Sequence, residues 1–163
     1  MKKLFSILLL ALLLSNCKDD DHTQPPVAEI YFTGLSETDY NGFPITIDTT
    51  DWTATDTWTR QEMNLFTSSY QTGCTPSSAN RVLVYPNPNN GLFRFIIEKD
   101  LDARTECRIV DENFKVLFAH ASIIPKSFSF DATKFGVKDT IRVYYKIIEN
   151  NCEFRGHGDI LIK

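Results

Sequence analysis

Apolar and polar residues alternate along most of the second half of the chain. The alternation is clearest over residues 92–98, where Phe93, Phe95 and Ile97 are separated by other side chains. A period of two residues is typical of a strand that buries one face. The pattern predicts about seven short strands, at residues 82–85, 92–98, 105–110, 115–119, 127–131, 141–148 and 159–162.

Turn-forming residues separate these strands, at positions 90–91, 111–113, 125–126, 149–151 and 156–158. Asn90-Gly91 is the clearest turn, because Asn-Gly tolerates positive φ and can reverse the chain tightly. Short strands at even spacing, joined by turns, favour two packed antiparallel sheets. We therefore expect residues 81–163 to form an all-β, immunoglobulin-like antiparallel β-sandwich.

Two prolines interrupt the pattern between the first two predicted strands. Pro86 and Pro88 have no backbone N–H, so neither can extend a sheet ladder, and each favours extended geometry in the residue before it. Residues 81–98 therefore read as a strand, a rigid corner, a tight turn and a second strand.

The first half of the mature chain lacks this alternation and is rich in Thr and Asp. Within it, Thr59 and Glu62 have the spacing of a capping box, and Trp58 can pack on Met63 across the helix start. These signals predict one short helix at residues 59–67. Short strands are predicted at 27–33 and 45–47, and a loop at 68–80.

Charge supports a boundary near residue 80. Residues 18–80 carry ten acidic and two basic groups, a net charge of −8, whereas residues 81–163 carry thirteen basic and eleven acidic groups, a net charge of +2. Residues 28–80 have too few apolar side chains for a core of their own. We expect this acidic extension to dock on the sandwich.

The extreme N-terminus has the pattern of a signal peptide. Lys2 and Lys3 precede a predominantly apolar run at residues 4–14. As a helix this run would be about 17 Å long, too short for a hydrocarbon core of about 30 Å. We predict that residues 1–16 are a leader and do not span a membrane.

The leader ends at a cysteine. Leu14-Ser15-Asn16-Cys17 resembles a bacterial lipobox, which implies that Cys17 is acylated and becomes the mature N-terminus. Each buried CH₂ contributes about 0.8 kcal/mol, so two or three acyl chains would hold the protein on membrane lipid. The alternative is an ordinary secretory leader followed by an incidental cysteine. Residues 17–27, which contain Pro25-Pro26, are expected to form a lipidated acidic tether.

Lys18-Asp19-Asp20-Asp21 directly follows the cysteine. As charges alone, these residues make a solvated linker that stays off an anionic surface. They also resemble the surface-export signal of lipoproteins in Gram-negative bacteria with type IX secretion systems. That resemblance implies an outer-membrane, lipid-anchored protein that faces the cell exterior.

Three cysteines remain after Cys17 is assigned to lipid. Cys74, Cys107 and Cys152 allow at most one intramolecular disulfide, and the sequence does not choose among the three pairings. One thiol is left over in a location expected to be oxidising.

The second half resembles the C-terminal sorting domain of type IX secretion cargo. The resemblance rests on the Tyr-Pro-Asn-Pro-x-x-Gly motif, in Tyr85, Pro86, Asn87, Pro88 and Gly91, on the strand–turn–strand at 108–116, and on the terminal apolar strand at 158–163. Phe114 stands where the family usually has glycine in its Asp-headed turn. The resemblance implies an immunoglobulin-like fold and recognition by the type IX apparatus, and places the whole chain with Bacteroidetes-type surface lipoproteins.

Catalytic residues are not suggested by the sequence. A hydrolase needs a nucleophile beside a positioned base, or two carboxylates in a cleft. His22 lies in the tether, His120 ends a predicted strand and His157 lies in a predicted turn, and none accompanies a nucleophile motif. We predict a non-enzymatic protein without a cofactor.

Metal sites have weak signals of two kinds. Cys107, Cys152 and His157 could ligate a metal, but the Cys-x₄-His spacing lacks a second paired motif, so a disulfide cysteine and a turn histidine are favoured. Asp48, Asp51 and Asp56 do not form a calcium-loop pattern, and Asp-rich turns cap helices without metal.

Trp52 and Trp58, with Tyr40 and Phe43 upstream, could form a platform that stacks on a glycan. The alternative, which we favour, is that the tryptophans pack the short helix on the sandwich. There is no basic, aromatic-interleaved patch of the kind that binds nucleic acid.

The sequence therefore predicts a non-enzymatic, lipid-anchored envelope protein, exposed at the surface, that acts as a structural or interaction module. One alternative is a sorting module recognised by the type IX secretion apparatus. Another is a glycan- or protein-binding surface module.

Overall fold

The computed structural model describes residues 29–32, 34–55, 57–75, 80–123 and 126–163. The predicted leader, Cys17 and Lys18 to Asp21 lie outside these residues. The described elements are β1 (Glu37–Thr38), β2 (Pro44–Thr46), α2 (Arg60–Met63), β3 (Arg81–Tyr85), β4 (Leu92–Glu98), β5 (Arg104–Val110), β6 (Val116–Ile123), β7 (Ser127–Asp131), the 3-10 helix η1 (Ala132–Phe135), β8 (Thr140–Glu149) and β9 (Cys152–Leu161).

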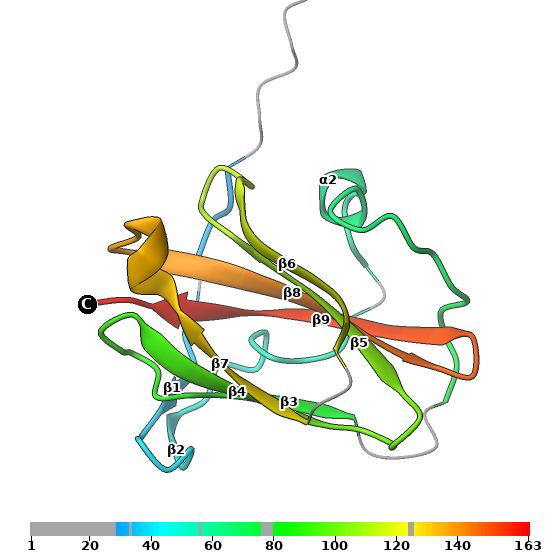
Figure 1. Ribbon diagram of the computed structural model, residues 1–163, viewed down its shortest axis with the longest axis horizontal. Coiled ribbons are helices and arrows are strands. Elements are labelled where there is room, and N and C mark those ends of the chain that lie inside the picture. The colour runs from blue at the N-terminus through cyan, green and yellow to red at the C-terminus, as the bar shows by residue number, and fades with distance from the viewer. Residues whose placement is uncertain (1–28, 33, 56, 76–79, 124–125) are drawn as a thin grey trace, which may run out of the picture.

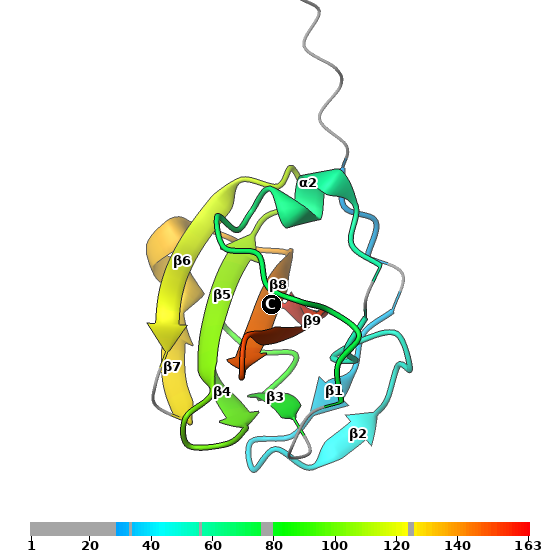
Figure 2. The ribbon, with the colours of Figure 1, turned by 90° about the vertical axis from the view of Figure 1, so that its right-hand side faces the viewer.

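Seven strands form a sandwich of two antiparallel sheets (Figures 1 and 2). One sheet has the order β3-β4-β7 and the other the order β6-β5-β8-β9. Hairpins join neighbours within a sheet, whereas the β4–β5, β6–β7 and β7–β8 connections cross between the sheets. The predicted all-β, immunoglobulin-like sandwich of seven strands is confirmed.

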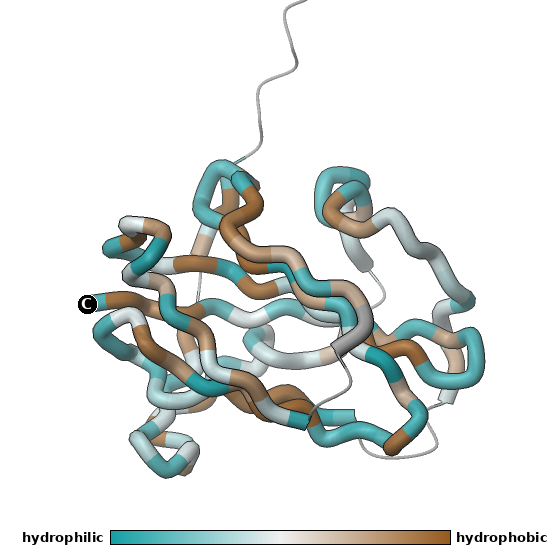
Figure 3. Tube along the Cα trace, in the orientation of Figure 1, coloured by the Kyte–Doolittle hydropathy of each residue, from teal (hydrophilic) through white to brown (hydrophobic). Residues whose placement is uncertain are grey.

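The alternating residues meet between the sheets. Phe93, Phe95 and Ile97 of β4 are 1–2% exposed, and they face Ile109, Ile141, Val143, Ile147 and Ile160 of the other sheet. Figure 3 shows the apolar segments concentrated along these strands. The period-two pattern therefore identified the core face of β4 correctly.

The last strand differs from its prediction. β9 begins at Cys152, so the turn predicted at 156–158 is wrong, and His157 lies in mid-strand opposite Tyr144. The glycines are there because the extension crosses this strand closely. A Cβ on Gly156 would lie 2.5 Å from the Thr53 carbonyl oxygen, and one on Gly158 would overlap the Trp52 ring. Gly156 and Gly158 leave room for a neighbour and do not reverse the chain.

Gly158→Ala tests this explanation. The added methyl group should push the Trp52 ring away and lower the free energy of unfolding by about 2 kcal/mol, measured by urea denaturation. In a Trp52→Ala background the same substitution should cost much less, because the obstructing ring is gone. An equal cost in both backgrounds would contradict the close approach of Trp52.

The extension covers the outer face of the four-stranded sheet. Trp58 and Phe66 stack with ring centroids 5.3 Å apart, and Trp58 meets Tyr144 of β8 edge-on at 5.6 Å. Ile30 and Val110 complete this outer cluster. As a result β8 is buried on both faces, with Ile141, Val143, Tyr145 and Ile147 in the inner core and Tyr144 in the outer cluster.

α2 is shorter than the predicted 59–67 helix. The capping box is present: the Thr59 N–H donates to the Glu62 carboxylate at 2.6 Å, and the Glu62 N–H donates to the Thr59 hydroxyl at 3.3 Å. The helix ends after one turn because the N–H groups of Leu65 and Phe66 donate to carbonyls three residues earlier, and the chain then folds toward the sheet. Met63 is therefore 44% exposed, and the predicted Trp58–Met63 packing is replaced by Trp58–Phe66.

The extension also lines the free edge of β9. Ala54 forms an antiparallel bridge with Gly156, and Gln71 forms a parallel bridge with Cys152. Edge strands left open can pair with other chains, so these short bridges protect β9. Residues 29–32 form no strand, contrary to the prediction for 27–33, although the Ile30 N–H donates to the Glu112 carbonyl at 2.8 Å.

Candidate functional site

The Pro-Asn-Pro corner connects β3 to β4 at one end of the sandwich. Tyr85-Pro86 and Asn87-Pro88 are both cis peptide bonds, and Gly91 has a φ of +101°. Gly91 thus occupies a conformation that other residues rarely adopt, as its place in the Asn-Gly turn predicts. The corner turns the chain so that the Asn87 side chain points into the protein.

Asn87 ties three segments together. It is 1% exposed, its Nδ2 donates to the Ser36 and Asp159 carbonyls at 2.8 and 2.9 Å, and its Oδ1 accepts from the Leu161 N–H at 3.0 Å. Its backbone N–H and C=O also pair with Thr38 of β1. The central residue of the motif is therefore a buried structural joint, without a face for a partner.

Asn89 extends the joint to the end of the chain. Its N–H donates to the Leu161 carbonyl, its carbonyl accepts from the Lys163 N–H at 2.8 Å, and its side chain accepts from the Gly91 N–H at 2.7 Å. The corner and the terminal strand thus form one hydrogen-bonded unit, and Lys163 lies beside the motif.

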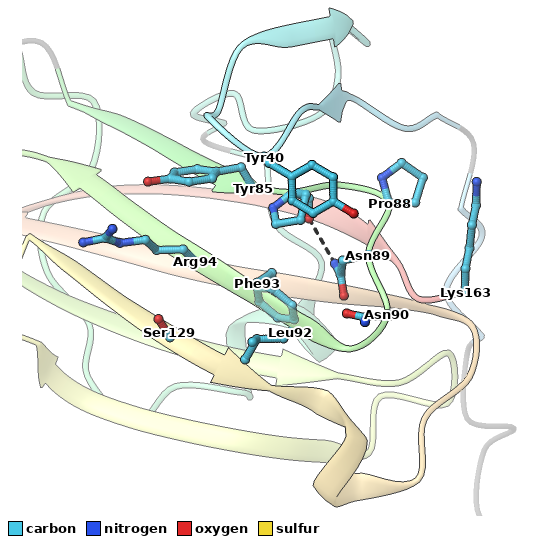
Figure 4. Close-up of a pocket in the computed structure, with 11 residues that line it drawn as sticks. Tyr40, Tyr85, Pro88, Asn89, Asn90, Leu92, Phe93, Arg94, Ser129 and Lys163 are labelled. Carbon is cyan, nitrogen blue, oxygen red and sulfur yellow. Dashed lines mark hydrogen bonds between the residues drawn. The ribbon is translucent and has the colours of Figure 1, made fainter.

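A groove of about 520 Å³ lies on the outside of this corner (Figure 4). We call it the corner groove. Its floor is the outer face of the three-stranded sheet, where Tyr85, Arg94 and Ser129 lie opposite one another on β3, β4 and β7. Figure 4 shows Arg94 at one end, Lys163 at the other, and Leu92 below the two tyrosine rings.

The β1–β2 hairpin provides the wall of the corner groove. Asp39 caps its turn by accepting from the Asn41 and Phe43 N–H groups at 2.9 and 2.8 Å, which presents Tyr40 with 86% of its surface exposed. Gly42, with φ +86°, lies so near Tyr85 and Leu83 that a side chain there would press on both. The hairpin is thereby seated on β3.

The sequence identified the motif but not the groove. Tyr40, Arg94 and Lys163 lie far apart in the sequence, and Arg94 carried no prediction. The alternation assigns Arg94 and Ser129 to the same outer face, which is the signal that could have joined them.

The two tryptophans lie on opposite sides of the four-stranded sheet. Trp58 is 7% exposed, in the outer cluster. Trp52 is half-buried against the inner core, at 5.8 Å from Phe95. The two rings share no surface, so they do not form one platform. Trp58 packs the helix segment on Tyr144 of β8, as the favoured alternative predicts, whereas Trp52 packs on Gly158 of β9 and on Phe95, away from the helix.

The candidate metal ligands and histidines lie apart from one another. His120 is exposed on β6. His157 is half-buried, and its pKa is lowered by burial and by Arg142 nearby. His22 and Asp56 lie outside the described residues. The Asp48 carboxylate accepts from the Thr50 N–H and hydroxyl. Among the described residues no three His, Cys, Asp or Glu side chains gather as metal ligands.

Asp51 is a buried carboxylate at the contact of the extension with β9. One oxygen accepts from the Ser36 N–H at 2.8 Å and the other from the Asp159 N–H at 2.7 Å. Burial, with a smaller contribution from the Asp159 charge, raises the pKa of Asp51 to about 6, against the two hydrogen bonds that lower it.

This pKa gives a testable pH dependence. Since the folded pKa lies above the unfolded value of 3.8, protonation of Asp51 stabilises the fold at low pH, and that contribution is lost as pH rises through about 6. The free energy of unfolding of the native protein minus that of Asp51→Asn should therefore be about 1 kcal/mol more positive at pH 5 than at pH 7.5. Urea unfolding at both pH values measures it.

Asp48→Asn is the matched control, because the pKa of Asp48 is lowered by its bonds to Thr50. The contribution of the Asp48 carboxylate to stability is lost only as pH falls toward and below 3.8. The native protein and Asp48→Asn should therefore differ in stability by the same amount at both pH values. An Asp51→Asn difference that stays constant, or grows toward pH 7.5, would contradict the raised pKa of Asp51.

Of the three cysteines left open by the sequence, Cys74 and Cys152 are joined in a disulfide across 78 residues. Cys107 is free and buried in β5, and burial raises its pKa to about 12. The remaining thiol is therefore kept protonated inside the sandwich, where it packs as a small apolar residue.

No family model, curated protein or solved structure matches the chain. The described residues contain no helix that is both long and apolar enough to cross a membrane.

Proposed function

We propose that the protein is a non-enzymatic, lipid-anchored envelope protein, displayed on the outer surface, and that it acts as an interaction module retained as one unit. The leader, Cys17 and the acidic residues after it support the anchoring and the display. The observation that carries retention is the Cys74–Cys152 disulfide, which crosses the boundary near residue 80.

The way the two halves are joined supports retention. Besides the disulfide, Tyr144 donates to the Glu62 carboxylate at 3.0 Å, and Lys146 donates to the Ser68 carbonyl at 2.8 Å. A cut between Cys74 and Arg81 would leave both pieces covalently linked until the disulfide is reduced. A removable tag would not be expected to hold its cargo in this way.

Mass spectrometry of the mature protein tests the proposal. We expect an acylated Cys17 and an intact Lys163 in one chain. Reduction should change its mass only by the hydrogens added to the two sulfurs of the disulfide. Protease treatment of intact cells should degrade the protein. A chain without acyl groups, or one protected in intact cells but degraded after lysis, would contradict the anchor or the display respectively.

The alternative is a sorting module recognised by the type IX apparatus. It is favoured by the position of Lys163 beside the Pro-Asn-Pro corner, since motif and terminal strand make one surface. This alternative predicts a mature form that loses its residues after about 80 once the disulfide is reduced. Detection of that form would replace retention by sorting.

A further inference from the structure

The outer face of the three-stranded sheet carries a row of unlike side chains at the corner groove. Tyr85, Arg94 and Ser129 are direct neighbours across three strands, at about 5 Å per strand. Tyr40 stands over this row from the hairpin, 86% exposed. An aromatic ring, a guanidinium and a hydroxyl in line are the groups that hold a polyhydroxylated ring, by stacking and by hydrogen bonds.

The charge of the corner groove differs from that of the chain. The protein has a formal net charge of −4, yet the charged side chains among the groove residues are Arg94 and Lys163. The nearby Asp131 carboxylate is held by the N–H and hydroxyl of Thr133. Two separated cations at the ends of an aromatic groove favour an elongated anionic ligand.

A peptide is a poorer fit to this surface. Peptides that bind sheets usually add a strand to a free edge, and β4 is paired on both sides, with β3 and β7. The middle of the groove floor therefore offers side chains, and a strand could be added only beyond it, at the outer edges of β3 or β7. A groove of about 520 Å³ is also within the usual range for small ligands, about 300–1,000 Å³.

We propose that the corner groove binds an acidic oligosaccharide, with the sugar rings stacked on Tyr40 and Tyr85 and the carboxylates paired with Arg94 and Lys163. This inference rests on the proposed function as an interaction module. Its test uses purified protein, so binding can fail while anchoring and retention still hold.

The full chain in neutral detergent is titrated by calorimetry with a hexamer of β-1,4-linked glucuronic acid. Cellohexaose is its neutral counterpart, since the two differ only at C6 of each sugar. The acidic hexamer should bind at least tenfold more tightly, and its affinity should fall as salt rises. Tyr40→Ala and Arg94→Gln should each weaken binding by about tenfold or more.

Matched controls lie outside the groove. Tyr31→Ala removes another exposed tyrosine, 79% exposed, and Arg60→Gln another exposed arginine; both should leave the affinity unchanged. Equal binding of cellohexaose, of free glucuronate or of hexaglutamate would overturn the assignment to an acidic saccharide. So would the absence of binding, or unchanged affinity in both groove variants.

Discussion

Cys74→Ser is expected to lower the free energy of unfolding by about 4 kcal/mol. The disulfide closes a loop of 78 residues, and a cross-link of that length stabilises the fold by about 4.5 kcal/mol in the chain-entropy treatment. Cys74 is the better partner to replace, because Cys152 is 6% exposed and serine there would bury a hydroxyl. Guanidinium unfolding of the oxidised native protein and the variant measures the difference.

Reduction supplies the control for this substitution. The native protein in dithiothreitol should lose about as much stability as Cys74→Ser, on the order of 4 kcal/mol, whereas the variant should respond little to the reductant. Cys107→Ala should keep the full sensitivity to reduction, because its thiol is free. If reduction shifts the variant as much as the native protein, a different pairing must stabilise the fold.

The sandwich was predictable because its signals are local. Alternation in β4 and β8, the Asn-Gly turn at Gly91 and the capping box at Thr59 each depend on neighbours in sequence. The hairpin turn between β8 and β9 is also local: Asn150 and Asn151 both have positive φ, at 49° and 63°, as a tight two-residue turn requires.

The errors arose where the two halves meet. Gly156 and Gly158 were predicted to form a turn because glycine usually signals one. Glycine is required at these positions because Thr53 and Trp52 leave no room for a side chain. Phe114 is a related case: its φ is +58°, where the resembled family has glycine, and its ring stacks on Tyr144 at 6.2 Å. Contacts between distant segments leave ambiguous traces in sequence.

The corner groove could be predicted only in part. The motif residues were identified, but a row across three strands requires the register of both β3–β4 and β4–β7 pairing. The hairpin that supplies Tyr40 is seated through Thr38, whose hydroxyl donates to the Val84 carbonyl at 2.8 Å from 46 residues away. Periodicity gives the face of a strand but not its register.

Asn87→Ala is expected to lower the free energy of unfolding by about 3 kcal/mol. The substitution leaves the Ser36 and Asp159 carbonyls and the Leu161 N–H without their side-chain partner, and each buried, unsatisfied group costs about 1–3 kcal/mol. Water cannot easily replace the amide, because Asn87 is 1% exposed. Thermal and urea unfolding of the full chain measure the loss.

Asn90→Ala is the matched control, since Asn90 is the exposed asparagine of the same corner. It should change stability by less than about 0.5 kcal/mol. A small effect of Asn87→Ala, similar to that of Asn90→Ala, would mean that the asparagine of the motif is not the joint between corner, β1 and terminal strand. A large effect at Asn87 alone would mean that the motif holds the architecture, and that any ligand contacts the groove beside it.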